Sequence, residues 1–321
     1  MRRPTKVFAL AGLVAASACE PLLAPAPSPL PTVERVVLVS VDGLRADAAM
    51  RMPALAELRA RGLWTDSMRT VLPALTVPGH LSMFTGRDVT TIGIRDNSLD
   101  TTAVLGWYVN GVSTVFDWVR GGGGRTVAIA GASLVPEDLR ADAERFFGVD
   151  TLIATDLEAA AVADRAIVEL ASGDAPDLLF VHFSDADLAG HDHGWIVPGA
   201  HAGGGGDSLG VSYMDAVMRV DAALARLAAA LAPAIDSGVV ALVVTADHGG
   251  GAGEGCVTDV PAWREHCTAA LGDELVPFVA VARDVAPGRI ARATRVTQVG
   301  PTVGALLGAW RPRKADEPIA Q

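Results

Sequence analysis

Five apolar runs along the chain have the length and composition of buried β-strands. They are rich in Val, Ile, Leu, Phe and Ala. Strands of a parallel sheet appear as continuous apolar runs, because helices cover both faces of the sheet. We therefore expect strands at residues 36–41, 126–130, 178–183, 239–245 and 276–281.

The longest helical pattern follows a glycine run at residues 203–206, and Asp207 or Ser208 is expected to cap its N-terminus. A second helix is expected at 301–307. Helical segments that alternate with apolar strands favour an α/β fold, a three-layer α/β/α sandwich with a mostly parallel central sheet. The apolar positions of the first helix recur at the spacing of one helical face: Tyr213, Val217, Val220, Leu224, Leu227 and Leu231.

The N-terminus has the features of an export signal. Arg2, Arg3 and Lys6 precede an apolar run at 7–16, which ends in small residues before Cys19. The run is too short for a permanent membrane anchor. We expect residues 1–18 to be a signal peptide. The sequence before Cys19 resembles a bacterial lipobox, so lipidation of Cys19 is one expectation and ordinary cleavage after export is the alternative.

The remainder of the chain divides by composition into three parts. Residues 19–32 are rich in proline, as an extended tether would be. Residues 33–312 are expected to form one folded domain. Residues 313–321 are expected to be a frayed tail. The protein should therefore be exported to the periplasm, and contact a membrane only through a lipid on Cys19.

The chain is acidic, with a formal net charge of −11, which becomes −14 without the three basic residues of the signal peptide. Binding to a nucleic-acid polymer is excluded, because it draws its affinity from Lys and Arg. Chemistry on a phosphate ester would need local positive charge, which bound metal ions could supply. Cys256 and Cys267 remain as an even pair in an oxidising compartment, so we expect a disulfide.

Polar groups follow three of the expected strands directly. Asp42 follows the first, Asp187 and His191 follow the third, and Asp247 and His248 follow the fourth. Open α/β sheets bind ligands beyond the carboxyl ends of their strands. Carboxylates and imidazoles together suit a borderline cation such as zinc. The sequence therefore predicts a metal site at this edge.

Several separated motifs resemble the alkaline phosphatase superfamily, specifically its branch of type I phosphodiesterases and nucleotide pyrophosphatases. The motifs occur in the same order as in that branch and extend over nearly the whole folded domain, which makes the resemblance specific. It implies an alkaline phosphatase-like fold. The matching segments are 36–43, 75–86 with Thr76-Val77-Pro78-Gly79-His80, 93–97, Asp187-x-x-Gly190-His191 and 245–249.

The resemblance also implies a site with two zinc ions, in which Thr76 is the nucleophile and forms a phosphothreonine intermediate. Asn97 would donate to a phosphoryl oxygen. A helix starting at Pro78 would add backbone donors. His266 is assigned as the last ligand because it precedes a Pro-apolar strand. By this resemblance, one zinc is surrounded by Asp42, Thr76, Asp247 and His248, and the other by Asp187, His191 and His266.

Such a site needs no separate base. Contact with a divalent cation favours the threonine alkoxide, and two metals about 4 Å apart can hold the attacking and leaving oxygens of a phosphoryl displacement. The expected substrate is a small phosphate ester, either nucleotide-like or an aryl diester. A sulfatase is disfavoured, because those relatives convert a Cys or Ser nucleophile to formylglycine, which Thr76 does not permit.

Two alternatives stay open within the fold, a phosphomonoesterase and a phosphonate hydrolase. A monoesterase would want extra positive charge near the metals, for which Arg45, Arg95 and Arg140 are candidates. From a different class, the chain could be an inactive exported metal-binding lipoprotein. His80 and His182 are interpreted as structural. Four further residues are open between a role in the substrate pocket and ordinary packing: Trp107, Tyr108, His193 and Trp195.

Overall fold

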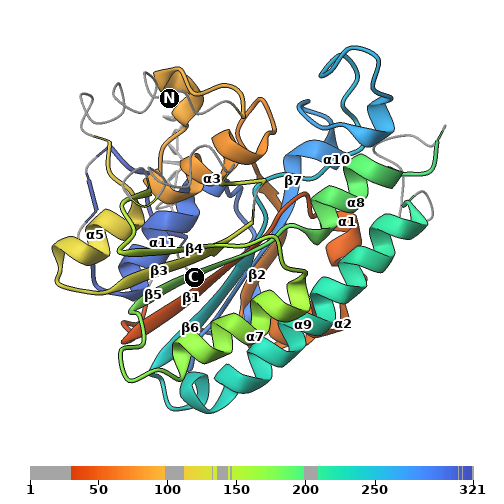
Figure 1. The fold of residues 1–321 in the computed structure, drawn as a ribbon. Helices are drawn as coiled ribbons and strands as arrows, with labels where there is room; N and C mark the ends of the chain where they lie inside the picture. Colours follow the sequence, from red (N-terminus) through yellow and green to blue (C-terminus); the bar gives the residue numbers. More distant parts are fainter. Residues whose placement is uncertain are drawn as a thin grey trace, which may run out of the picture.

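A single eight-stranded sheet lies at the centre of the computed structural model (Figure 1). The structure describes residues 30–97, 112–131, 133–135, 144, 147–198, 209–309, 311–312 and 314–319. The signal peptide expected at 1–18, and the tether up to residue 29, lie outside this part of the chain. No helix among the described residues combines the length and the apolarity that a membrane crossing requires.

Seven of the eight strands run in one direction, and β7 opposes them. The order across the sheet is β4-β3-β5-β1-β6-β7-β2-β8. The expected mostly parallel sheet is therefore confirmed. In chain order the strands are β1 (Arg35–Val41), β2 (Leu63–Arg69), β3 (Thr126–Ala130), β4 (Thr151–Ala154), β5 (Leu178–Phe183), β6 (Val240–Thr245), β7 (Leu275–Val281) and β8 (Gly288–Arg289).

The direction of β7 differs from the parallel arrangement expected of the apolar runs. No crossover helix joins β6 to β7 in the described residues. Instead, the chain leaves β6 at the carboxyl edge of the sheet and re-enters β7 from that same edge. A strand that starts where its neighbour ends must run back along it, so Thr245 pairs with Phe278 in an antiparallel ladder.

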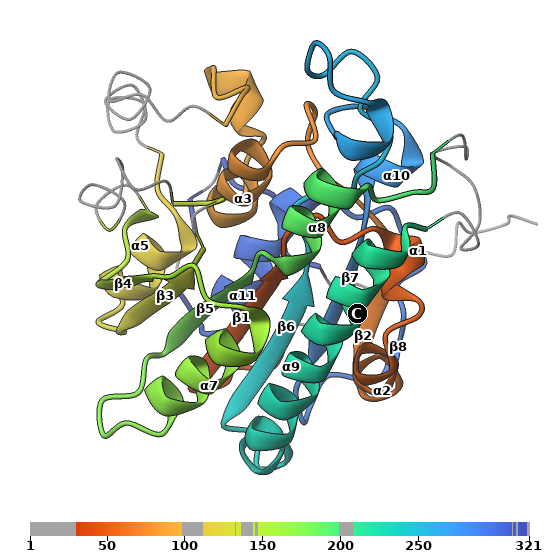
Figure 2. The same ribbon diagram turned by 45° about the vertical axis from the view of Figure 1, so that its right-hand side comes forward.

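Helices cover both faces of the sheet, which completes the three layers (Figures 1 and 2). One layer contains α2 (Pro53–Arg61), α7 (Ala159–Leu170) and α9 (Val211–Asp236). The other contains α3 (Thr76–Thr85), α5 (Val115–Gly121) and α11 (Val299–Leu306). The remaining helices are α1 (Ala46–Ala49), α8 (Asp185–His193), α10 (Leu271–Glu274), and the 3-10 helices η1 (Val89–Ile92), η4 (Ala262–Arg264) and η5 (Val296–Gln298).

Helix α9 begins later than the sequence suggested. Its N-cap is Gly210, whose backbone is extended, and its first helical residue is Val211. The expected caps, Asp207 and Ser208, lie outside the described residues. The apolar stripe itself is buried as expected, from Tyr213 to Leu231. The helix near the C-terminus also forms, as α11.

A carboxylate on α9 caps the neighbouring helix α2. Met52, the N-cap of α2, provides no side-chain cap, and the backbone N–H groups of Ala54 and Leu55 donate instead to Asp221 at 3.1 and 3.2 Å. We expect Asp221→Ala to lower the free energy of unfolding by about 1 to 2 kcal/mol, because two buried donors lose their acceptor. Urea unfolding would measure this loss, and an unchanged midpoint would contradict it.

Part of the segment expected to be a frayed tail is packed on the domain. Ala315 and Ile319 are buried. The N–H of Ile319 donates to Thr302 Oγ1 on α11, and the N–H of Asp316 donates to the carbonyl of Gly86 at the end of α3. Because apolar burial and backbone hydrogen bonds both hold it, residues 314–319 are an ordered part of the fold.

Candidate active site

The predicted site residues converge at the carboxyl edge of three adjacent strands. β5, β1 and β6 are neighbours in the sheet, and each ends directly before polar residues. Asp42 follows β1, and Asp247 and His248 follow β6. Helix α8 follows β5 and carries Asp187 and His191 one turn apart. Parallel neighbours end at one edge, so these side chains meet there.

The turn after Asp42 depends on glycine. Gly43 has φ +67°, and a Cβ there would lie 2.9 Å from Asp187 Cα. The carbonyl of Gly43 accepts hydrogen bonds from Trp195 Nε1 at 2.9 Å and Tyr213 Oη at 3.0 Å. Two buried aromatic side chains therefore fix the turn at Gly43, and the absence of a side chain there lets Asp187 pack closely against it.

Three buried carboxylates face one another across the site. Within the described residues, Asp42 Oδ1, Asp187 Oδ1 and Asp247 Oδ2 are buried oxygens that accept no hydrogen bond. A buried carboxylate oxygen without a partner costs several kcal/mol, and bound cations would remove that cost. The residues present therefore fit a site for divalent metal ions.

Three histidines present their Nε2 atoms to this cage. In each ring Nδ1 lies against a backbone carbonyl: His248 Nδ1 is 2.7 Å from Gly249 O, His266 Nδ1 is 2.6 Å from Ala74 O, and His191 Nδ1 is 3.1 Å from Arg264 O. A carbonyl only accepts, so each Nδ1 carries a proton, and Nε2 is the ring nitrogen available to a metal.

The ligand atoms fall into two overlapping groups. One contains Asp42, Asp247 and His248, and the other contains Asp187, His248 and His266, each group within 4.8 Å. His191 Nε2 lies 3.2 Å from His266 Nε2 and 3.6 Å from Asp187 Oδ1, so it belongs beside the second group. The structure thus brings all six side chains together, with His248 between the two groups.

Burial and the nearby charges shift the pKa values of the three carboxylates. Burial, and then the negative charge of Asp42, raise the pKa of Asp187 and Asp247 well above the usual range. Burial would also raise the pKa of Asp42, but the hydrogen bond from His182 and the nearby imidazole of His248 hold it well below the usual range. Burial opposes the charged form of His248, yet Asp247 and Asp42 raise its pKa to about 10. The cage therefore attracts positive charge.

Thr76 is the first residue of α3, so this helix begins two residues before Pro78, where the sequence suggested it would start. Thr76 Oγ1 lies 3.1 Å from His248 Nε2, and the side chain is 3 % exposed. The expected extra backbone donor is engaged elsewhere, because the N–H of Val77 donates to Asn97 Oδ1 at 3.0 Å. Asn97 therefore caps the first turn of α3 through its side-chain oxygen.

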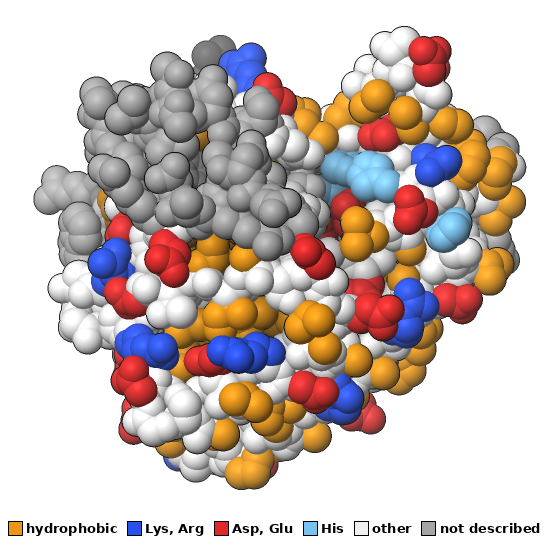
Figure 3. All heavy atoms as spheres, in the orientation of Figure 1, with side chains coloured by type: hydrophobic (Ala, Val, Ile, Leu, Met, Phe, Trp, Pro, Cys, Tyr) orange, Lys and Arg blue, Asp and Glu red, His pale blue; other side chains and the backbone are white. Residues whose placement is uncertain are grey.

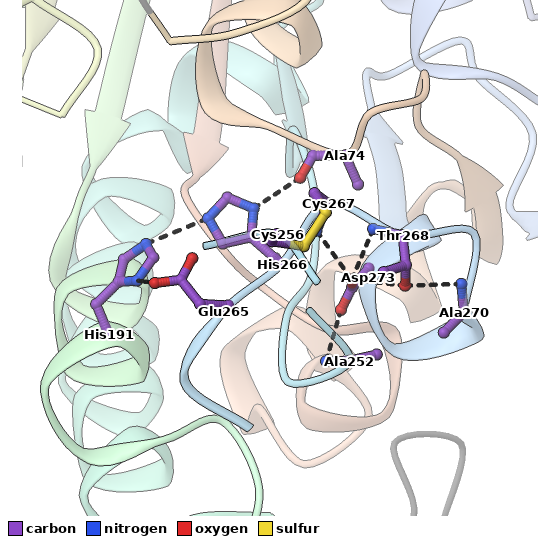
Figure 4. The surroundings of a disulfide bond; sticks show 10 residues. All are labelled: Ala74, His191, Ala252, Cys256, Glu265, His266, Cys267, Thr268, Ala270 and Asp273. Atoms are coloured by element: carbon purple, nitrogen blue, oxygen red, sulfur yellow. Dashed lines mark hydrogen bonds and ion pairs between the residues drawn. A yellow bond between two sulfur atoms is a disulfide. The ribbon is translucent and has the colours of Figure 1, made fainter. Parts of the chain in front are cut away.

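His266 is held by a disulfide and a hydrogen-bond network (Figure 4). The expected bond between Cys256 and Cys267 is present, directly after His266 in the chain. The ring of His266 stacks on that of His248, with centroids 3.7 Å apart. In Figure 4, His266 points between Ala74 and His191. Closing so short a loop contributes about 2 to 3 kcal/mol in the chain-entropy model.

The remaining candidates divide into packing residues and residues outside the described chain. Trp195 is fully buried, between Gly190 and Gly250, so its role is structural. His193 lines a hollow of ≈ 610 Å³ on the face of α8 opposite Asp187 and His191. Trp107 and Tyr108 lie outside the described residues. Figure 3 shows histidine side chains at the surface, on the floor of a notch beside the lobe that follows β6.

Two of the three arginines considered for a monoesterase lie within the described residues, and both make contacts with other parts of the protein. Arg45 is paired with Asp47 at 2.7 Å and donates to the carbonyl of Gly250. Arg95 donates to the carbonyl of Thr90. Arg140 lies outside the described residues.

Sequence reasoning set aside two histidines that contact the site and did not consider one serine that does. His80, interpreted as structural, is buried and joins Ser40 Oγ to the carbonyl of Thr76. His182 contacts Asp42 at 3.1 Å, and Ser133 donates to the same carboxylate at 2.9 Å. For the two histidines the signal was present, because a polar side chain within an apolar strand or helix needs a partner.

Comparison with known proteins agrees with this geometry. Residues 36–270 match the family model described as Type I phosphodiesterase / nucleotide pyrophosphatase. The chain belongs to this family. No curated protein sequence matches the chain.

Solved structures resemble the type I phosphodiesterase chain in fold. Murine ectonucleotide pyrophosphatase/phosphodiesterase 5, solved as an inactive threonine-to-alanine variant in complex with AMP, has a TM-score of 0.64 at 15% identity, over 90% of this chain and 97% of that one. An alkaline phosphatase superfamily protein from Vibrio parahaemolyticus has a TM-score of 0.57 at 19% identity, over 90% and 71%. The lipoteichoic acid synthase LtaP from Listeria monocytogenes has a TM-score of 0.62 at 14% identity, over 87% and 73%.

Proposed function

We propose that this protein is an exported phosphodiesterase that hydrolyses small nucleotide-like or aryl phosphodiesters with Thr76 as nucleophile and two bound zinc ions. The observation that carries the proposal is the position of Thr76 Oγ1, 3.1 Å from His248 Nε2, at a cage containing three unpartnered carboxylate oxygens. Export to the periplasm, with or without a lipid on Cys19, is part of the same proposal.

The ligand set favours zinc over magnesium. Magnesium prefers oxygen ligands and retains water, whereas three imidazoles beside three carboxylates suit a borderline ion. Asp42, Asp247 and His248 would hold one ion, next to Thr76, and Asp187, His191 and His266 the other. When bound, the ions would act as Lewis acids that lower the pKa of the threonine hydroxyl and neutralise charge on the phosphoryl group.

The chain's own residues would then direct the displacement. Thr76 Oγ1 gives its proton to solvent and forms a bond to phosphorus while the bond from phosphorus to the leaving oxygen breaks, and that oxygen takes up a proton from solvent as the alcohol. Water then gives up a proton as it attacks phosphorus, the bond to Thr76 Oγ1 breaks, and Thr76 Oγ1 takes up a proton from solvent. His80 takes no part in these proton transfers. Its contact with the carbonyl of Thr76 fixes the first turn of α3. The side-chain nitrogen of Asn97, whose oxygen accepts from Val77 N–H, would donate to a non-bridging oxygen.

A nucleotide-like substrate is supported by the murine relative, whose structure was solved in complex with AMP. The contacts of Arg45 favour a diester over a monoester. A monoester carries more negative charge and would need an additional cationic side chain, but Arg45 is already paired with Asp47 and donates to the carbonyl of Gly250. The phosphonate hydrolase remains a variant of the same chemistry.

Hydrolysis assays with and without chelator test this proposal. We expect bis-p-nitrophenyl phosphate to be hydrolysed with a kcat/KM at least about tenfold above that of p-nitrophenyl phosphate. Removal of metal with EDTA should abolish both activities, because only bound cations would offset the three buried carboxylates. Added zinc should restore them.

Other outcomes separate the alternatives. Faster hydrolysis of the monoester would identify a phosphomonoesterase. A protein that binds two zinc ions and hydrolyses neither ester would be an inactive metal-binding lipoprotein. Activity that resists complete removal of metal would contradict the proposed site.

A further inference from the structure

Asp42 is anchored differently from the other two carboxylates of the cage. Its Oδ2 accepts two hydrogen bonds, from Ser133 Oγ at 2.9 Å and from His182 Nε2 at 3.1 Å. Its Oδ1 accepts none within the described residues and lies 3.3 Å from His248 Nε2. One oxygen is thus fully engaged by the protein, while the other faces the cage.

The ring of His182 is oriented to donate. The backbone N–H of Gly131 donates to His182 Nδ1 at 3.2 Å, so Nδ1 is an acceptor and Nε2 carries the proton. This tautomer is the opposite of that in the three cage histidines, whose Nδ1 atoms face carbonyl oxygens. His182 therefore cannot serve as a ligand through Nε2 while it bonds Asp42.

The sheet register places the two residues together. His182 on β5 pairs with Ser40 on β1, and Asp42 lies two residues beyond Ser40, on the same face. His182 is 1 % exposed and Asp42 0 %, so water does not compete for this bond. Glycine at position 131 lets this backbone pass close to Ser184 and His182, because a Cβ there would lie 2.1 Å from Ser184 Oγ.

We propose that His182, assisted by Ser133, is a positioning residue that restricts Asp42 to single-oxygen binding of the cation beside Thr76. Without His182, Oδ2 keeps one donor, and the carboxylate is free to rotate about its Cβ–Cγ bond. It would then present either oxygen, or both, to the cation. The inference rests on the proposed metal site and extends it to a residue outside the ligand set.

Zinc affinity tests this proposal independently of turnover. Metal-free protein would be titrated with zinc against a chromophoric chelator, and elemental analysis would give the stoichiometry. His182→Leu is expected to weaken binding of one of the two ions by about 10- to 100-fold and to lower kcat in parallel. His182→Gln places an amide nitrogen near the original Nε2 and is expected to recover most of that affinity.

Asp221→Ala is the matched control. It also removes hydrogen bonds between buried groups, but between α9 and α2, neither of which carries a cage residue, and should lower stability while the zinc affinity stays unchanged. A purely structural role for His182 would give that same pattern. If His182→Leu does not fold, Ser133→Ala decides, because its half-buried hydroxyl anchors the same oxygen and its loss should weaken zinc in the same direction.

The outcomes separate this inference from the proposed function. Wild-type protein that binds no zinc would overturn both. Wild-type protein that binds two ions, with equal affinity in His182→Leu, or in Ser133→Ala where the leucine variant fails to fold, would overturn only the role of His182. Weaker binding that glutamine restores would support it.

Discussion

Replacing Thr76 with alanine is expected to lower kcat for an aryl phosphodiester by about 10³-fold or more, while both zinc ions remain bound. The reason is the position of its hydroxyl, which lies 3.1 Å from His248 Nε2 at the end of α3. Alanine preserves the helix and removes only the nucleophilic oxygen. The carboxylates and imidazoles that would hold the ions are unchanged.

Steady-state kinetics and elemental analysis of the same preparation would measure both effects. Thr76→Ser is the matched variant, because it keeps a hydroxyl with greater rotational freedom, and it should retain far more activity than alanine. An alanine variant with wild-type kcat would mean that Thr76 is not the nucleophile. An inactive variant without zinc would instead point to a failure of the metal site.

Replacing Asp273 with alanine is expected to lower the free energy of unfolding by about 3 to 5 kcal/mol and to weaken zinc binding at the His266 side. Asp273 is fully buried. Its Oδ2 accepts from the N–H groups of Cys267 and Thr268 and from Thr268 Oγ1, and its Oδ1 accepts from the N–H of Ala252. One side chain thus ties together both sides of the loop that Cys256 and Cys267 close (Figure 4).

Two measurements separate the effects on stability and on zinc. Unfolding in urea with excess chelator gives the stability of the metal-free chain, and zinc titration under native conditions gives the affinity. Asp221→Ala again serves as control, since it should reduce stability by less and leave zinc unaffected. Unchanged zinc affinity in Asp273→Ala would show that the Asp273 hydrogen bonds are not needed to hold His266 in place.

The central strands and the ligands behind them could be predicted from the sequence for one physical reason. β1, β3, β5 and β6 are buried on both faces, so their sequences are continuous apolar runs. The polar residue that ends such a run, Asp42 or Asp247, must lie at the sheet edge. Chain order and strand burial thus fixed much of the site without any knowledge of tertiary contacts.

The strands that were missed lack that signal. β2 (Leu63–Arg69) includes Asp66 and Ser67, because parts of it reach the surface, and its residues alternate irregularly in burial. β4 is only four residues long, and all of them are half-buried. β8 is shorter still. The direction of β7 was also beyond reach, since it depends on the path of the chain between Ala246 and Glu274 rather than on the apolar residues of the strand.

The support around Asp42 was missed for another reason. Asp42, Ser133 and His182 come from three separate segments, and only the register between β1 and β5 brings them into contact. An isolated histidine in an apolar strand indicates that a partner exists, but not which one. Pairing information of that kind is absent from a single sequence.

The reversal at β7 has a consequence for engineering. Residues 246–274 leave the sheet at Thr245 and return to it beside that point, since Thr245 and Phe278 are paired. The two ends of this segment therefore lie close together. Its outer part could be exchanged for the corresponding segment of a relative while the sheet and its helices stay unchanged. The ligands Asp247, His248 and His266 and the clamp at Asp273 would need to be kept in such chimaeras.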